Sequence, residues 1–228
     1  EAEDGIRDAQ ESRGLGDVYK RQMGERHAAI RDVPKPVIAR VQGYAIGGGN
    51  VLCTSCDFTI ASEKAVFGQV GPKVGSVDPG YGTAFLARVV GEKKAREIWY
   101  MGRRYSGKDA EAMGLANLCV PHEDLDKTVQ AWGEELCERS PTAIAIAKRS
   151  FNMDTAHQAG IAGMGMYALK LYYDTEESRE GVKALGEAMA AHNGKEYDAM
   201  KGTASAVAKR IRNDVIAGGF GTDISVSA

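Results

Sequence analysis

With 228 residues, of which 43% are hydrophobic, the chain is long enough to bury one substantial core. Its 29 basic and 31 acidic residues nearly cancel, which argues against a surface for nucleic acid or anionic lipid. No apolar run approaches the roughly 18 residues of a membrane helix, and the start of the sequence lacks the order of a signal peptide. Because of this charge balance, we expect the partner to be a small molecule or another copy of the chain. Four scattered cysteines make no disulfide framework, so we expect a cytoplasmic protein.

The first half of the sequence predicts strands that alternate with helices. Residues 1–26 are charged and lack apolar periodicity, so we expect a weakly structured lead-in. Val37–Ala45 is rich in apolar and β-branched residues and predicts a buried strand. The triple glycine Gly47–Gly49 and the apolar run to Ser55 predict a tight turn into a helix. Phe58–Ser62 predicts a second strand, and Val66 to Phe67 extends the pairing.

From Thr83 onward the apolar spacing is mostly helical, with one strand over Leu115–Val120 that Pro121 closes. Ser106 followed by Asp109 predicts a capped helix start. The further helices are expected over Thr83–Val90, Lys93–Met101, Leu125–Glu138, Pro141–Asn152, Ala156–Tyr173 and Thr175–Ala191. Strands and helices interleave first and helices alone follow, so we predict an α/β core with a helical C-terminal region of the kind that often serves assembly.

Two glycine-dense segments are candidates for a ligand pocket. Backbone amides in Gly47–Gly49 lie at the positive end of a predicted helix and could stabilise an oxyanion, although one amide alone makes no oxyanion hole. The same residues could form a plain strand-to-helix turn. In the second segment, Phe67–Gly82, the hydroxyl and carboxyl groups belong to Ser76, Asp78 and Tyr81.

Each of these side chains also has an ordinary structural interpretation. Asp78 precedes Pro79, which could hold the carboxylate rigid for acid or base chemistry, or could simply belong to an Asx turn. Ser76 could point the same way or bond to the backbone of a turn. Cys53 and Cys56 share one predicted helix face without a second pair or a histidine cluster, which indicates core residues.

The histidines and the late tyrosines carry weaker signals. We expect all four histidines to be isolated and solvated, so none is predicted as a ligand or a base. Tyr172 and Tyr173 end a predicted apolar helix, where packing and a hydroxyl that faces a pocket are both open interpretations.

The sequence resembles the crotonase (enoyl-CoA hydratase/isomerase) superfamily from about His27 to Gly181. The stretches that carry the resemblance are Val37–Asn50, Cys56–Ala61, Phe67–Gln69 and Asp174–Gly181. The resemblance implies an α/β, crotonase-like spiral core that is N-terminally truncated and carries a helical C-terminal region. It divides the chain into an unmatched segment 1–26, a partial core 27–121, a helical oligomerisation region 122–192 and a divergent tail 193–228.

The resemblance also implies an acyl-CoA substrate and a homo-oligomer, a trimer or hexamer. In the family, two backbone amides hold the thioester carbonyl, and one of them falls on Gly48. The two catalytic glutamates of the hydratases correspond here to Val51 and Gly71. Simple alkene hydration is therefore not expected.

The run Gly71–Gly82 resembles the branch that contains 2-ketocyclohexanecarboxyl-CoA hydrolase and 1,4-dihydroxy-2-naphthoyl-CoA synthase. The catalytic positions of that branch fall on Ser76, Asp78 and Tyr173, and Gly48, Gly71 and Tyr81 fall at the oxyanion and substrate site. The resemblance favours hydrolytic ring opening of a cyclic β-keto acyl-CoA, without a metal or redox cofactor.

Two alternatives stay open at this point. The first is ring closure of the synthase type, in which bicarbonate near Gly71 replaces the missing carboxylate. The second is a catalytically incomplete fragment that serves only assembly or CoA binding. A sheet edge left exposed by missing strands would make such a fragment prone to association.

Overall fold

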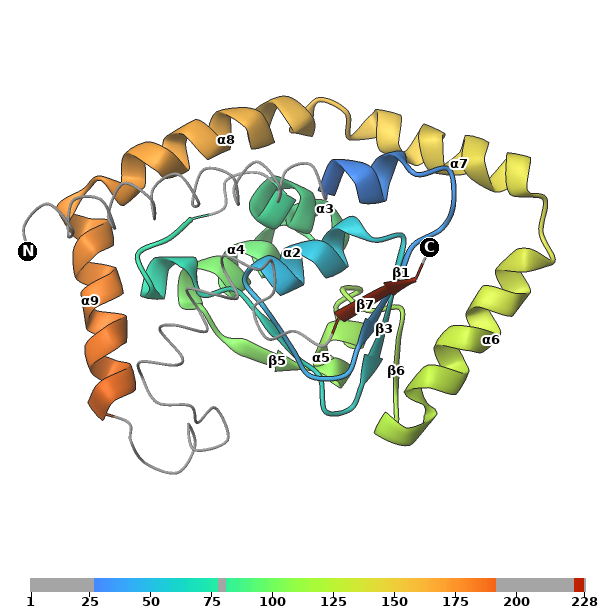
Figure 1. Ribbon diagram of the computed structural model, residues 1–228, viewed down its shortest axis with the longest axis horizontal. Coiled ribbons are helices and arrows are strands. Elements are labelled where there is room, and N and C mark those ends of the chain that lie inside the picture. Colours follow the sequence, from blue (N-terminus) through green and yellow to red (C-terminus); the bar gives the residue numbers. More distant parts are fainter. Residues whose placement is uncertain (1–26, 78–80, 192–223, 228) are drawn as a thin grey trace, which may run out of the picture.

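The computed structural model describes residues 27–77, 81–191 and 224–227 (Figure 1). The strands are β1 (Ile38–Val41), β2 (Tyr44–Ile46), β3 (Phe58–Ser62), β4 (Val66–Gly68), β5 (Arg104–Ser106), β6 (Leu118–Val120) and β7 (Ile224–Ser227). The α-helices are α2 (Gly48–Ser55), α3 (Leu86–Val90), α4 (Glu92–Met101), α5 (Gly107–Ala112), α6 (Leu125–Cys137), α7 (Pro141–Asp154), α8 (Gln158–Tyr173) and α9 (Glu176–Ala191). Short 3₁₀ turns are η1 (Gly71–Lys73) and η3 (His122–Asp124), and η2 (Tyr81–Phe85) is a π-helical turn.

The described strands form two sheets. In the first, β1, β3 and β6 run parallel in the order β6-β3-β1, and β7 adds to the free side of β1 in the antiparallel direction. In the second, β4 lies between a parallel β2 and an antiparallel β5. Parallel strands joined through helices are the pattern that the interleaved half of the sequence predicts, and the α/β fold class is confirmed.

The single strand predicted over Val37–Ala45 is wrong. The chain bends at Gln42 and Gly43, so its first half pairs with β3 in one sheet and its second half with β4 in the other. The bend is a physical consequence of sharing one apolar run between two sheets. The helix after the triple glycine and the strand Phe58–Ser62 are confirmed.

Two apolar clusters hold the core. The larger lies among both sheets and α2 to α5, with Phe67, Leu86 and Ile98 almost fully buried. The smaller joins Ile60 to Leu125, so α6 covers the opposite side of the first sheet, at the right of Figure 1. The sheet is therefore covered on both faces, as a parallel sheet requires.

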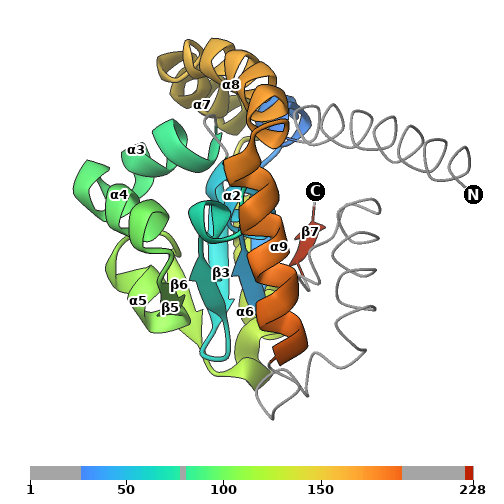
Figure 2. The same ribbon diagram turned by 90° about the vertical axis from the view of Figure 1, so that its left-hand side faces the viewer.

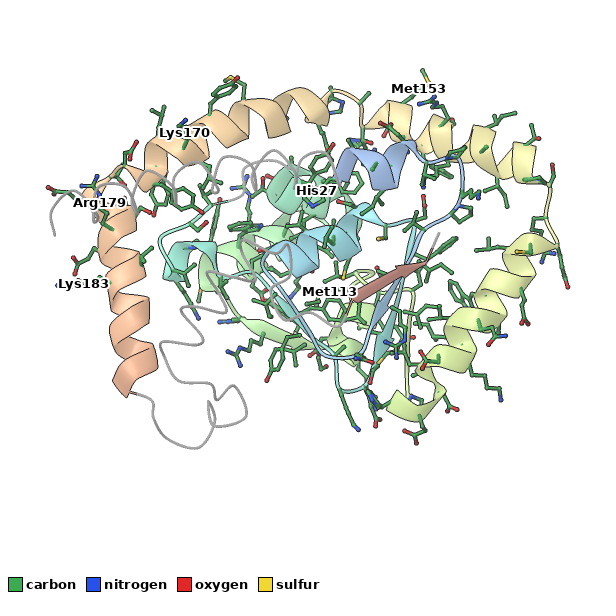
Figure 3. The ribbon with its side chains drawn as sticks, in the orientation of Figure 1. His27, Met113, Met153, Lys170, Arg179 and Lys183 are labelled. Carbon is green, nitrogen blue, oxygen red and sulfur yellow. The ribbon has the colours of Figure 1, made fainter. Side chains whose placement is uncertain are left out.

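The helical C-terminal region is confirmed as an extended arm. Helices α7 and α8 follow one another as an arch across the top of Figure 1, and Figure 2 shows α9 running down from the end of α8. Met153 projects outward from α7, and Arg179 and Lys183 lie on the outer side of α9 (Figure 3). Large apolar side chains are exposed along this arm, namely Ile146, Phe151, Met153, Ile161, Met164, Tyr167, Leu171 and Val182.

A buried lysine on α7 binds the arm to the core. Lys148 Nζ donates to the Asp57 carboxylate at 2.6 Å and to the carbonyls of Ile30 and Lys35 at 2.8 Å each. The same Asp57 oxygen accepts from the Val37 amide at 2.8 Å. Helix α7 is thereby joined to the point where β1 begins.

Strand β7 was not predicted, because the region after Asn193 carries no strand pattern in the sequence. Most of that tail, and residues 1–26, lie outside the described residues. Across the described parts of the chain, no helix has both the length and the apolar character needed to cross a membrane.

Candidate active site

The N-terminus of α2 offers backbone amides without side chains in front of them. Gly47 has φ of 59°, a conformation that favours glycine, and its amide donates to the Gly68 carbonyl at 3.0 Å. This bond ties the start of the helix to the end of β4. Gly48 is the first helical residue, so its amide has no acceptor within the helix and lies at the positive end of the helix dipole. The geometry suits an oxyanion, as the sequence predicts for Gly48.

The loop after β4 folds on itself around Gly71. The Gly71 carbonyl accepts from the Val74 amide at 3.0 Å and from the Ser76 amide at 2.9 Å. A Cβ atom added to Gly71 would lie 2.6 Å from both the Trp99 ring and the Ser76 carbonyl, so no larger side chain fits. Trp99 is held in turn by a hydrogen bond from its indole nitrogen to the Gly82 carbonyl. A carboxylate therefore has no room at position 71.

Ser76 and Tyr173 are brought together although 97 positions separate them. The serine Oγ and the tyrosine hydroxyl are 2.7 Å apart, and either oxygen can be the donor. Tyr173 is the last residue of α8, and both residues are partly buried. A phenol beside a serine hydroxyl can orient a substrate oxygen and pass it a proton.

Tyr81 lies at the start of η2, which packs against both α2 and α8. Its ring centroid is 5.0 Å from that of His27, and Phe85 lies edge-on to it at 6.2 Å. His27 is only 4% exposed, so the prediction that all four histidines are solvated is wrong. The sequence could not reveal this burial, because the covering residues come from η2. Burial lowers the pKa of the neighbouring Arg31, and the nearby Tyr81 opposes that shift.

Asp78, with residues 79 and 80, lies outside the described residues, so its role stays a prediction. Val51, the other position that the resemblance assigns to a hydratase glutamate, is an apolar side chain buried to 1% exposure within α2. Neither of the two predicted positions carries a carboxylate. Ser76, Tyr173 and Tyr81 are the predicted side chains that the described structure displays.

Among the described residues, three buried side-chain amides have an atom without a hydrogen-bond partner, namely Asn50, Gln69 and Gln158, and sequence reasoning missed all three. Asn50 in α2 is fully buried, and neither its Oδ1 nor its Nδ2 has a hydrogen-bond partner. Gln69 is 2% exposed, and its Nε2 also lacks a partner. Asn117 behaves differently, because its Oδ1 accepts from the Thr59 amide at 2.8 Å. The only signal in the sequence is a polar residue within an apolar run.

Burial affects the cysteine pair at the other end of α2. Burial raises the pKa of Cys53, and burial together with the nearby Asp57 raises the pKa of Cys56 to about 12. Both thiols therefore stay protonated at neutral pH. The interpretation of Cys53 as a core residue is confirmed, whereas Cys56 is only partly buried at the end of the helix.

The sequence profile of the enoyl-CoA hydratase/isomerase family matches residues 5–195. The match covers most of the chain and includes every site residue described above. The chain belongs to the enoyl-CoA hydratase/isomerase family, which is the crotonase superfamily that its motifs resemble.

Solved structures agree with this assignment. An enoyl-CoA hydratase from Mycobacterium avium subsp. paratuberculosis K-10 is 26% identical with a TM-score of 0.69, and the match covers 77% of this chain and 71% of that one. A carnitinyl-CoA dehydratase from Mycobacterium avium 104 is 25% identical with a TM-score of 0.64, over 69% and 64% of the two chains. A monofunctional enoyl CoA isomerase from M. smegmatis is 32% identical with a TM-score of 0.50, over 56% and 60%. The chain thus spans between 60% and 71% of the length of these relatives.

Proposed function

We propose that this protein opens the ring of a cyclic β-keto acyl-CoA, such as 2-ketocyclohexanecarboxyl-CoA, by hydrolysis. The observation that carries the proposal is the 2.7 Å contact between the Ser76 and Tyr173 hydroxyls. It occurs in a family of acyl-CoA enzymes, in a chain whose Val51 and Gly71 provide no carboxylate. These hydroxyl groups are therefore the ones to which we assign a part in the reaction.

The reaction we propose is a retro-Claisen cleavage. Asp78, oriented with Ser76, takes a proton from water, and the oxygen of that water forms a bond to the ring ketone carbon. The bond between this carbon and the carbon next to the thioester then breaks. Its electron pair forms a thioester enolate, whose oxygen the Gly48 amide stabilises. Protonation of the enolate carbon gives an open-chain acid that still carries the CoA thioester.

Tyr173 has a defined task in this scheme. Its hydroxyl, held by Ser76, orients the ring ketone or supplies the proton that the enolate carbon takes up. Water and the substrate supply every atom of the product. The scheme therefore needs neither an electron acceptor nor a second substrate.

Alkene hydration, the reaction after which several of the similar proteins are named, fits this chain less well. A hydratase of this family uses two glutamates to add water across a double bond. At the first position, Val51 is buried and apolar, and at the second, Trp99 and the Ser76 carbonyl occupy the space that a side chain of residue 71 would need. Water activation is left to the loop that carries Ser76 and Asp78.

Replacement of Asp78 tests the proposal. Asp78→Asn should nearly abolish ring opening and leave CoA-ester binding intact, since the amide cannot accept the proton of the attacking water. Turnover is followed by chromatography of the open-chain product, and binding by calorimetry. Asp126→Asn is the control, because Asp126 is an exposed residue on α6 that pairs with Arg40 of β1. Unchanged turnover in Asp78→Asn would contradict the proposal.

Ring closure of the 1,4-dihydroxy-2-naphthoyl-CoA synthase type is a second candidate. Its support is Gln69, whose buried Nε2 has no partner and lies two residues before Gly71. An amide donor there would suit a small anion such as bicarbonate. Conversion of succinylbenzoyl-CoA to a naphthoyl product that rises with added bicarbonate would favour the synthase. Formation of the open-chain acid, still bound to CoA, from the cyclic ketone without bicarbonate would favour the hydrolase.

We further propose that the active form is a homo-oligomer, a trimer or hexamer, assembled through the C-terminal arm. The support is the series of exposed apolar side chains on α7 and α8, of which Phe151 and Met164 are 78% and 76% exposed. Size-exclusion chromatography with light scattering tests this. A defined oligomer whose melting temperature rises with acyl-CoA supports an enzyme, and a polydisperse aggregate supports the alternative of an incomplete fragment.

A further inference from the structure

The residues around the turn between α8 and α9 form hydrogen bonds with two consecutive residues, Gly75 and Ser76, of the loop after β4. Tyr173, just before the turn, contacts the Ser76 side chain, and Ser178, just after it, donates its hydroxyl to the Gly75 carbonyl at 2.6 Å. Ser178 is 1% exposed, so this second bond is shielded from water. Tyr173 and Ser178 thus hold both the side chain of Ser76 and the backbone before it.

Helix α9 also lies in direct backbone contact with the loop. A Cβ added to Gly181 would lie 2.7 Å from both Cα and N of Gly75, and a Cβ added to Gly75 would lie 2.3 Å from the Ser178 carbonyl. Gly75 has φ of 67°, so its backbone also favours glycine. The two glycines allow an approach that no other pair of residues would permit.

The turn itself is braced from within. The Thr175 hydroxyl donates to the Tyr172 carbonyl at 2.6 Å and accepts from the Ser178 amide at 3.2 Å. These bonds fix the start of α9 relative to the end of α8. A displacement of Ser178 would therefore be transmitted to the Tyr173 side of the turn as well.

We propose that Ser178 and Gly181 are positioning residues, which set the placement of the Ser76 hydroxyl against Tyr173 through the backbone of Gly75. This inference rests on the proposed function of Ser76 and Tyr173. Neither Ser178 nor Gly181 need touch the substrate. Their effect is on the distance and direction between the Ser76 and Tyr173 hydroxyls, and a misplacement of about 1 Å at a site can cost on the order of 10²-fold in rate.

Three variants and a reference separate this role from general stability. Gly181→Ala pushes α9 away from Gly75, and Ser178→Ala removes the bond to the Gly75 carbonyl without adding bulk. Gly160→Ala on α8 is the matched control, because nothing lies within 4 Å of the added Cβ and alanine favours a helix. The third variant, Ser76→Ala, removes the hydroxyl group that Ser178 and Gly181 are inferred to position.

Steady-state ring opening is the first readout. We expect Gly181→Ala to lower kcat on the order of 10²-fold and Ser178→Ala about 10-fold, with KM nearly unchanged and with melting temperatures that show folded protein. Gly160→Ala should match the wild type. In a Ser76→Ala background, Gly181→Ala should cost little more, because its effect acts through Ser76. Equal losses in both backgrounds would overturn the inference.

A second readout does not depend on catalysis. In protein labelled with 3-fluorotyrosine, the fluorine signal that Tyr173→Phe removes belongs to Tyr173. That signal should shift in Gly181→Ala and Ser178→Ala and stay in place in Gly160→Ala. Shifts without ring opening in the wild type would reject the proposed function and keep the positioning role. An unshifted Tyr173 signal in both Gly181→Ala and Ser178→Ala would reject the positioning role, whatever reaction the protein catalyses.

Discussion

Two attachments of the C-terminal arm to the α/β core differ in kind. On α7, the charged amino group of Lys148 donates hydrogen bonds to the Asp57 carboxylate and to the carbonyls of Ile30 and Lys35. At the α8–α9 turn, neutral hydroxyls and two glycines make the contact with the site loop. The first attachment holds the start of β1, and the second holds Ser76.

The two attachments are expected to serve different purposes, the one on α7 stability and the one at the α8–α9 turn catalysis. A buried ion pair with every donor satisfied resists displacement but leaves nothing free to react. The contact of Ser76 with Tyr173 is short and partly buried, and a hydroxyl group can both donate and accept hydrogen bonds. We therefore expect changes at α7 to lower stability, and changes at the α8–α9 turn to lower the rate.

The largest effect on stability is expected for Lys148→Met. The substitution leaves the Asp57 carboxylate with the Val37 amide and removes the bonds to the Ile30 and Lys35 carbonyls. Loss of one partner of a buried pair costs about 3–5 kcal/mol, and we expect the low end because 26% of the Asp57 side chain is exposed.

Urea denaturation of Lys148→Met measures this cost, with Lys127→Met on the exposed side of α6 as the control. At temperatures where the variant stays folded, its KM and kcat should be close to those of the wild type. A stable variant with impaired turnover would contradict the division between the two attachments.

A smaller effect of opposite sign is expected for Asn50→Leu. Unlike Lys148, the buried Asn50 amide has no partner, and leaving such a group unpaired costs about 1–3 kcal/mol. An apolar side chain of similar shape should therefore raise the free energy of unfolding by about 1 kcal/mol. Asn117→Leu should do the reverse, since it removes the acceptor of the Thr59 amide. Urea curves of both variants check the prediction, and a destabilised Asn50→Leu would contradict it.

Features set by neighbouring residues could be predicted from the sequence. The strand Phe58–Ser62 and the helix after the triple glycine depend on local patterns, and the capping box of Ser106 and Asp109 forms as its spacing predicts. The bend at Gly43 could not be predicted, because it depends on which strand each half of an apolar run will join. Strand β7 depends on a partner more than 180 residues earlier in the chain, at β1.

The site divides in the same way. Gly48 could be placed at a helix start from the glycines alone, whereas Tyr173 could be joined to Ser76 only through the family resemblance. The contact of Ser178 with Gly75 crosses 103 positions and involves a backbone carbonyl, which leaves no pattern in the sequence. Close approaches between backbone segments become visible only when both segments are seen together.

A double-mutant cycle on ring opening tests the central claim most directly, with 2-ketocyclohexanecarboxyl-CoA as substrate and Ser76→Ala, Tyr173→Phe and the double variant as enzymes. If the two hydroxyls act as one unit, each single change should lower kcat by about 10²-fold, and the double change should cost little more than either one. Two results would contradict the claim, provided that the wild type turns over the substrate. In one, the losses of the two single variants multiply in the double variant; in the other, Tyr173→Phe loses no activity.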